Sequence, residues 1–225
     1  NCTNLESITL SDHLTSVGGY TFSGCTSLSA ITIPDSVTSI GQAAFSGCTS
    51  LTEITIPNSV TSMEEIIFSD CTNLTDVVLS EDLSWIQDST FSNCTSLKSV
   101  KIPSNADTIY RSAFSGCTSL ESITIPKSVD LIEQYAFYDC NSLKDIYYFG
   151  TETQWNKIDI EENSAGDGNG ALKNATIHYN KTIEPFTYNF STDGKSVVIV
   201  KCDKSVSEAT IPSEIEGLPV TVIDD

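Results

Sequence analysis

The stretch from Leu28 to Thr49, LSAITIPDSVTSIGQAAFSGCT, recurs along the chain with a period of 23 residues. Each unit ends near a cysteine, and these cysteines stand at positions 2, 25, 48, 71, 94, 117 and 140. A phenylalanine precedes the cysteine by three residues at positions 22, 45, 68, 91, 114 and 137. No insertion disturbs this phase. A fixed period of this length is typical of a solenoid, in which every unit forms one coil stacked on the next.

Within a unit, the spacing of the apolar residues changes from every second residue to every third or fourth residue. Ile31 and Ile33 alternate with polar residues and are followed by Pro34, which predicts a short strand that ends at the proline. Apolar spacing over residues 40–45 instead favours a short helical or 3-10 turn on the return side. We therefore expect a β-rich, right-handed solenoid of the α/β type with one short parallel strand per 23-residue coil.

Two further positions of the repeat carry structural information. The residue before the cysteine is always Gly, Asp or Asn, types that tolerate positive φ, which predicts a left-handed turn there (Gly24, Gly47, Asp70, Asn93, Gly116 and Asp139). Equivalent cysteines of stacked coils lie ~4.8 Å apart with parallel side chains, whereas a disulfide requires Cβ atoms ~3.8 Å apart and turned toward each other. We expect a ladder of buried thiols.

The periodicity divides the chain into three segments. Residues 1–146 form the repeat array, and residues 147–180 are predicted to close it with a short helix at 151–158, an acidic, glycine-rich loop and a strand near 175–180. In residues 181–225, after a linker, alternating residues on both sides of Thr-Asp-Gly predict a hairpin. Thr210, Ile211 and Pro212 then match the strand end of the repeat, which predicts the start of a second array.

Composition excludes several classes of function. Thirty acidic and eleven basic side chains give a net charge of −19, which repels nucleic acid and anionic lipid. No run of eighteen apolar residues and no leader are present, so we expect no membrane insertion of this segment. Because Asn1 falls inside a repeat, we expect a fragment of a longer protein.

The combination Leu-x-x-Ile-x-Ile-Pro-x-Ser-Val-x-x-Ile-x-x-x-Ala-Phe-x-x-Cys-x-x-Leu resembles the BspA-like class of leucine-rich repeats. The resemblance covers residues 1 to about 148 and continues more weakly to the end of the chain, and residues 154–156 and 175–179 resemble the closing segment of such arrays. It implies a solenoid exported to the bacterial cell surface and, for some members, adhesion to host matrix proteins or other cells. It implies no catalytic motif and no cofactor.

The strand residues between the inward Ile positions should line an exposed sheet face, the usual binding surface of a repeat array. Most of them are small, and half are Ser or Thr. The residues that depart from this pattern are our candidate binding residues: Glu53, Asp76, Val78, Lys101, Asp145 and Tyr147. The alternative is that a Ser/Thr face only keeps the sheet soluble. The aromatic residues Tyr147 to Phe149 and Trp155 are candidates for a sugar platform or, alternatively, for a cap on the last coil.

Metal and catalytic chemistry have little support in the sequence. Residues 165–176 lack the first and twelfth acidic ligands of a calcium loop, although a looser site of Asp159, Glu161, Glu162 and Asp167 stays open. The two histidines, at positions 13 and 178, have no nucleophile motif beside them. An enzyme would need a pocket that gathers one of them with carboxylates.

These observations predict a non-catalytic, monomeric binding module at the outside of a bacterial cell, without cofactor, metal or nucleic acid. Its partner would be an extracellular protein or glycan. The alternative is a structural spacer that holds another domain away from the envelope and binds nothing itself.

Overall fold

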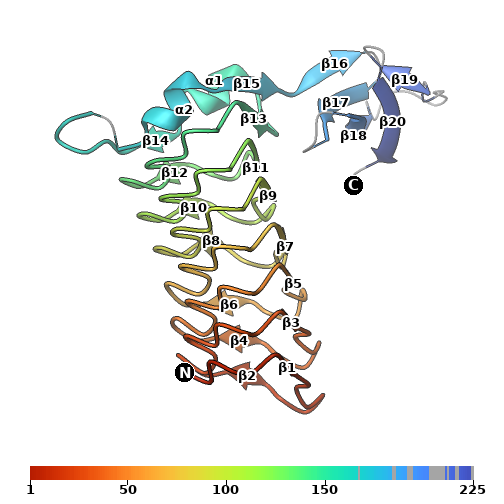
Figure 1. Ribbon diagram of the computed structural model, residues 1–225. Coiled ribbons are helices and arrows are strands. Elements are labelled where there is room, and N and C mark those ends of the chain that lie inside the picture. Colours follow the sequence, from red (N-terminus) through yellow and green to blue (C-terminus); the bar gives the residue numbers. More distant parts are fainter. Residues whose placement is uncertain are drawn as a thin grey trace.

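The computed structural model describes residues 1–166, 168–183, 186–191, 195–202, 211, 213–215 and 218–223. These residues form a column of stacked coils, followed by a small β-module beside the last coil (Figure 1). Within the described ranges, helix occurs only in α1 (Glu152–Trp155) and α2 (Gly170–Asn174). The predicted β-rich solenoid is confirmed.

Parallel strands build the first ladder and follow one another at the repeat period up to β13, after which β15 closes it. They are β1 (Ser7–Ile8), β3 (Ala30–Ile31), β5 (Glu53–Thr55), β7 (Asp76–Val78), β9 (Ser99–Lys101), β11 (Ser122–Ile125), β13 (Asp145–Tyr148) and β15 (Thr176–Tyr179). The paired residues of adjacent array strands are 23 positions apart, as in Glu53 opposite Asp76. Since side chains alternate between the two faces of a strand, the Ile rows point into the core and the polar rows point outward.

A second ladder, which the sequence analysis did not predict, runs along the neighbouring side of the column. It consists of β2 (Ser16–Val17), β4 (Ser39–Ile40), β6 (Ser62–Met63), β8 (Trp85–Ile86), β10 (Thr108–Ile109), β12 (Leu131–Ile132) and β14 (Asp159–Ile160). Each coil therefore contributes two strands instead of one. A strand of two residues, such as Ser39–Ile40, contains only one polar-to-apolar step. One step is too short for alternation to be recognised in the sequence.

The return side of each coil forms hydrogen-bonded turns where a short helical turn was predicted. Ala43 has a φ of 52° and Gly47 a φ of 71°, and these left-handed residues interrupt any helix. The backbone N–H groups of Ala43, Phe45 and Gly47 donate to carbonyls of the next coil over 2.8 to 3.0 Å. The predicted left-handed residue before each cysteine is confirmed from Gly24 to Asp139. The chain thus uses inter-coil hydrogen bonds on this side as well.

The core consists of one layer per coil, repeated along the column. The phenylalanine rings stack with centroids 5.2 to 5.7 Å apart and planes inclined by 11° to 17°. Beside them, the Cys48 thiol donates to the Phe22 carbonyl over 3.2 Å, and the same bond recurs up to Cys140 and Phe114. Stability is therefore distributed over contacts between neighbouring coils.

The predicted ladder of free thiols is confirmed from Cys25 to Cys140, which are all buried and unpaired. Cys2, in the first coil, is exposed, so the ladder has six buried members where seven were expected. Burial raises the pKa of the Cys48 and Cys140 thiols to about 12. These cysteines are therefore protonated core residues at neutral pH.

The closing coil begins where the repeat pattern ends. Thr151 caps α1 through a capping box with Gln154, which confirms the predicted start of the helix. The helix ends at Trp155, so its predicted extension to residue 158 is wrong. Trp155 of this helix packs edge-on against Tyr148, with ring centroids 5.2 Å apart, so both aromatic residues cap the core. β15 then pairs with β13 and extends the first ladder by one strand.

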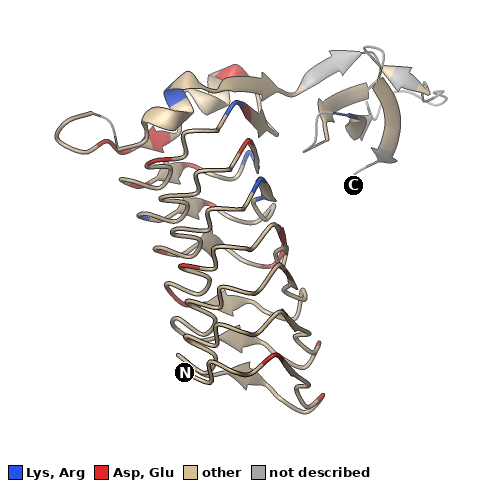
Figure 2. Ribbon diagram, in the orientation of Figure 1, with Lys and Arg blue, Asp and Glu red and all other residues tan. Residues whose placement is uncertain are grey.

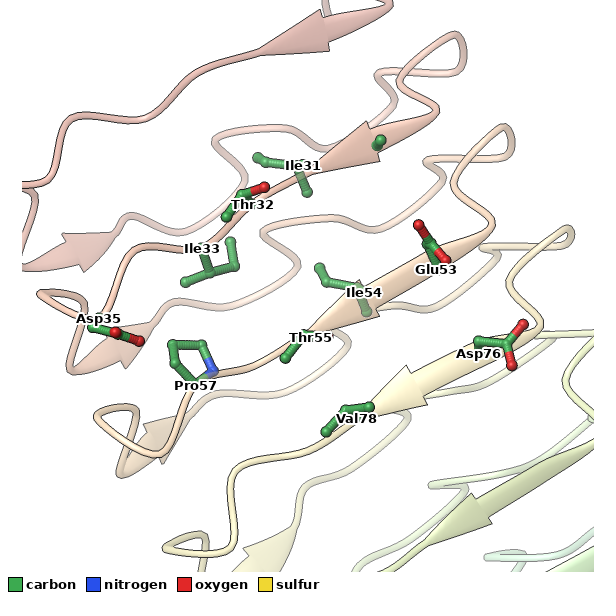
Figure 3. A pocket seen from close by; sticks show the side chains of 11 residues that line it. Ile31, Thr32, Ile33, Asp35, Glu53, Ile54, Thr55, Pro57, Asp76 and Val78 are labelled. Carbon is green, nitrogen blue, oxygen red and sulfur yellow. The ribbon is translucent and has the colours of Figure 1, made fainter.

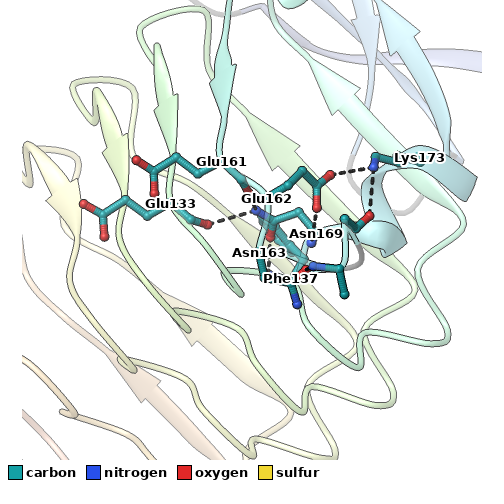
Figure 4. A network of polar contacts seen from close by, with 9 residues as sticks. Glu133, Phe137, Glu161, Glu162, Asn163, Asn169 and Lys173 are labelled. Atoms are coloured by element: carbon teal, nitrogen blue, oxygen red, sulfur yellow. Dashed lines mark hydrogen bonds and ion pairs between the residues drawn. The ribbon is translucent and has the colours of Figure 1, made fainter.

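A buried asparagine ties the acidic loop to the last full coil (Figure 4). The Asn169 side chain accepts from the Phe137 N–H over 3.0 Å and donates to the carbonyls of Glu133 and Glu161 over 2.9 and 2.7 Å. Glu162 accepts from the Asn169 N–H and forms a 2.7 Å ion pair with Lys173. These contacts hold the described part of the loop against the last full coil.

The C-terminal module is a five-stranded sheet in the order β16 (Lys181–Ile183), β17 (Phe186–Phe190), β18 (Val197–Cys202), β20 (Leu218–Ile223) and β19 (Glu214–Ile215). β17 and β18 are antiparallel, which confirms the predicted hairpin. Thr210 and Pro212, which suggested a second array, lie outside the described residues. The division of the chain at residues 147 and 181 stays a prediction.

Candidate binding face

The outward side of the first ladder is the candidate binding face. Its two rows come from alternate strand positions, which the parallel register places side by side in successive coils. In β5 and β7 the outward residues are Glu53 and Thr55, opposite Asp76 and Val78, and all four are exposed. The predicted exposure of these four residues is therefore confirmed, and their role in binding stays a prediction.

A shallow hollow of about 450 Å³ lies over this part of the face (Figure 3). Glu53 and Asp76 stand at one end of it, while Thr55, Val78 and Pro57 lie toward the other end. Val78 is the most exposed large apolar side chain of the face, with 59% of its surface accessible. The hollow thus combines two adjacent carboxylates with an apolar floor.

Lys101 is exposed on β9, but its charge is already balanced. Its Nζ lies 2.7 Å from Oε1 of Glu81. Partial burial raises the pKa of the Glu81 carboxyl, but hydrogen bonds from the Lys101 ammonium and the Ser104 N–H outweigh burial and leave this pKa below its usual value. Such a pair on a partly exposed surface contributes about 0–1 kcal/mol to stability. Its effect is to neutralise the one cation of this part of the face.

The expected exposure of Tyr147 is wrong. Its ring stacks on His178 of β15, with centroids 4.8 Å apart, and lies 6.5 Å from Phe190 of β17. Only 6% of its surface is accessible. Asp145 is half-buried, and its Oδ1 lies 2.8 Å from Nε2 of His178. The C-terminal module therefore covers the end of the face, and the open part of the face extends from β3 to β9.

His178, Asn189 and Phe190 are the contact residues that sequence reasoning missed. Asn189 is buried, and its Nδ2 donates over 3.1 Å to the Tyr148 carbonyl and to Oδ1 of Asn180. The ring of Phe190 lies edge-on to that of His178, with centroids 5.6 Å apart. These residues lie in segments that occur only once and are outside the 23-residue repeat, so the periodicity could not indicate their contacts.

Charge is distributed unevenly along the column. All eleven Lys and Arg residues lie at or after Lys98, so the coils before it carry acidic side chains and the single histidine His13. Figure 2 shows blue segments only in the upper coils, the closing coil and the C-terminal module. The open face therefore lies mainly in a negative field.

The two histidines lie far apart, at opposite ends of the array. His13 is exposed in the first coil, beside Asp12 at 3.7 Å, while His178 is engaged by Asp145 at the opposite end of the array. Across the described part of the chain, no three His, Cys, Asp or Glu side chains lie close enough to hold a metal ion. Asp167, a member of the looser calcium site, lies outside the described residues. Among the described helices, none has the length and apolarity of a membrane span.

Solved structures of bacterial leucine-rich repeat proteins are similar to this chain. A protein from Bacteroides ovatus is 31% identical, with a TM-score of 0.64 over 73% of this chain and 47% of its own length. A leucine-rich repeat protein of T. pallidum is also 31% identical, with a TM-score of 0.61 over 63% of this chain and 68% of its own. A protein from Eubacterium ventriosum is 28% identical, with a TM-score of 0.62 over 72% of this chain and 42% of its own.

The chain thus spans about half the length of the B. ovatus protein. No curated protein shows significant similarity to it. A family model described as the BspA type leucine-rich repeat region matches residues 1–119 and 76–192, with six copies of the repeat. The repeat period, the stacked coils and these matches agree, and the chain belongs to the BspA-type leucine-rich repeat family.

Proposed function

We propose that this chain is a non-catalytic protein-binding module that acts in adhesion outside a bacterial cell. The observation that carries the proposal is the open part of the first-ladder face. There, the departures from a Ser/Thr surface at Glu53, Asp76 and Val78 lie together over one hollow. Leucine-rich repeat arrays are generally protein-interaction or structural modules. The partner would be an extracellular protein or a glycan, bound by a monomer.

The structural spacer is the second candidate function. It is favoured by the continuous stack, in which the register repeats without a slip and the Phe rings run through the column. Such a rod resists bending because every coil is hydrogen-bonded to the next. A spacer needs no ligand and would tolerate any polar side chain on the outward face of the first ladder.

Binding to an array of extracellular-matrix proteins and glycans separates the two functions. The test variant carries D76S, V78S and K101S on the open face. The control carries D130S, W85S and K127S, which change exposed residues of the same kinds outside this face and leave the net charge equal. Saturable binding that is lost only in the test variant supports the proposal. Binding to no component of the array, with circular dichroism showing a folded chain, contradicts adhesion by this segment and supports the spacer.

A further inference from the structure

We propose that the open face binds an extended peptide segment in which a basic and an apolar residue alternate as basic-x-apolar. The basic side chain would lie between Glu53 and Asp76, and the apolar side chain would lie over Thr55 and Val78. This inference rests on the proposed function and names the chemistry of the partner.

The first argument concerns the carboxylate pair. Glu53 and Asp76 are directly opposite in the register of β5 and β7, at a strand separation of ~4.8 Å. Like charges at directly opposite positions destabilise a sheet. Neither carboxylate forms an ion pair within the described residues, and Asp76 accepts only a hydrogen bond from the Thr75 hydroxyl. A cation bound between the two would relieve their repulsion, and a guanidinium has five donors with which to reach both.

The second argument concerns spacing. Thr55 and Val78 follow the two acids by two residues, which places them about 6.6 Å farther along the strands, with Val78 as the apolar contact. An extended peptide has the same advance between side chains on one of its sides, because they also recur every second residue. A basic-x-apolar segment that lies along β5 and β7 therefore meets both pairs at once. The 59% exposure of Val78 and the hollow beside it leave room for the apolar side chain.

The third argument concerns the wider field. No Lys or Arg precedes Lys98, and Lys101 at the border of the open face is neutralised by Glu81. The nearby Asp35, which also lines the hollow, adds to the negative charge. Clefts lined by charge of one sign raise the local concentration of ligands of the opposite sign. A cationic partner is thus favoured over an acidic one at this face.

Two synthetic peptides of equal composition test the proposal by fluorescence anisotropy at low and physiological salt. One repeats Thr-Arg-Thr-Val, which places Arg and Val on one side when extended. The other repeats Thr-Arg-Val-Thr, which places them on opposite sides. We expect the first peptide to bind at least fivefold more tightly. E53Q/D76N should weaken its binding at least tenfold and V78S at least threefold.

The matched control is E6Q/D130N, which removes two exposed carboxylates elsewhere and alters the net charge equally. It should change the affinity by less than twofold. An equal loss in both double variants would reduce the effect to general electrostatics and overturn the proposal. Equal affinity for the two peptides would overturn the alternation. Titration with calcium chloride in a calorimeter is the last control. Saturable calcium binding that is lost in E53Q/D76N would show that the acidic pair binds a metal ion, and it would overturn the proposal.

The same variants separate this inference from the proposed function. If a partner from the matrix array no longer binds D76S/V78S/K101S but still binds E53Q/D76N, the face is a binding surface and the basic-x-apolar inference is wrong. If neither the array nor the peptides bind to the folded chain, both fail.

Discussion

The buried thiol ladder predicts an unusual sensitivity to alkali. Burial raises the pKa of the Cys48 and Cys140 thiols to about 12 from an ordinary value of 9.0, and it raises the pKa of Cys71, Cys94 and Cys117 as well. Above pH 9 the unfolded chain loses these protons while the folded chain keeps them. The unfolded state then binds fewer protons, so the free energy of unfolding falls as the pH rises.

The expected magnitude follows from this linkage. Cys48 and Cys140 each remove between about 1 and 2 kcal/mol of stability between pH 8 and pH 10, so the two together remove about 3 kcal/mol. Cys71, Cys94 and Cys117 act in the same direction. Since the total stability of a typical domain is only ~5–15 kcal/mol, we expect the reduced protein to be markedly less stable at pH 10 than at pH 8.

Urea denaturation at pH 8, 9 and 10 under reducing conditions measures this effect. The variant C71A/C94A should be less stable than the parent at pH 8, because two core side chains are shortened, but it should lose less stability than the parent between pH 8 and pH 10. The single variants should each show half of that difference. C2A, which changes the exposed cysteine and leaves the buried ladder complete, should lose as much as the parent. An equal loss in the parent and in C71A/C94A would refute the argument.

Three further predictions concern the stack and its end. Gly41→Ala should destabilise the fold by about 3 kcal/mol, because its Cβ would lie 2.5 Å from the backbone N of Gly19. Gly47→Asn should cost less than about 0.5 kcal/mol, because Asn93 occupies the equivalent position of another coil. Urea denaturation measures both. Similar costs for both would contradict the close approach of backbones. Phe91→Ala should cost about 3–5 kcal/mol, because the ring stacks on both neighbours; a calorimetric loss below about 1 kcal/mol would mean that the stack contributes little. Asn189→Ala should speed proteolysis of the C-terminal module and cost about 1–3 kcal/mol, since it leaves the Tyr148 carbonyl without this donor; unchanged cleavage kinetics would indicate that the module is held by other contacts.

Much of the array follows from local chemistry that repeats. The apolar alternation, the cysteine period and the Gly, Asp or Asn before each cysteine predicted the first ladder, the free thiols and the left-handed turns. Each of these signals recurs six times or more in the chain. Repetition amplifies a pattern that would be weak in a single copy, and for a solenoid the neighbour of every residue is known from the period alone.

The features that the sequence left unpredicted have little or no local signal. A second left-handed position contains Tyr20, Ala43, Ile66, Ser89, Ser112 and Tyr135. None of these types favours positive φ, and Ile66 opposes it. The conformation is imposed by the neighbouring coil, which accepts hydrogen bonds from these turns. For Ala43, the N–H reaches the Glu65 carbonyl over 2.9 Å.

The candidate binding face shows the same division. The exposure of Glu53, Asp76 and Val78 was predicted correctly, because it depends only on the strand period and on the register between coils. Tyr147 occupies the same row, yet it is buried, because His178 of the closing coil stacks on it and Phe190 approaches it from a segment more than forty positions later in the chain. The period of the sequence determined which residues point outward from the column. The tertiary packing of the non-repeating C-terminal module decided which of them meet solvent, since burial depends on contacts that no repeat encodes.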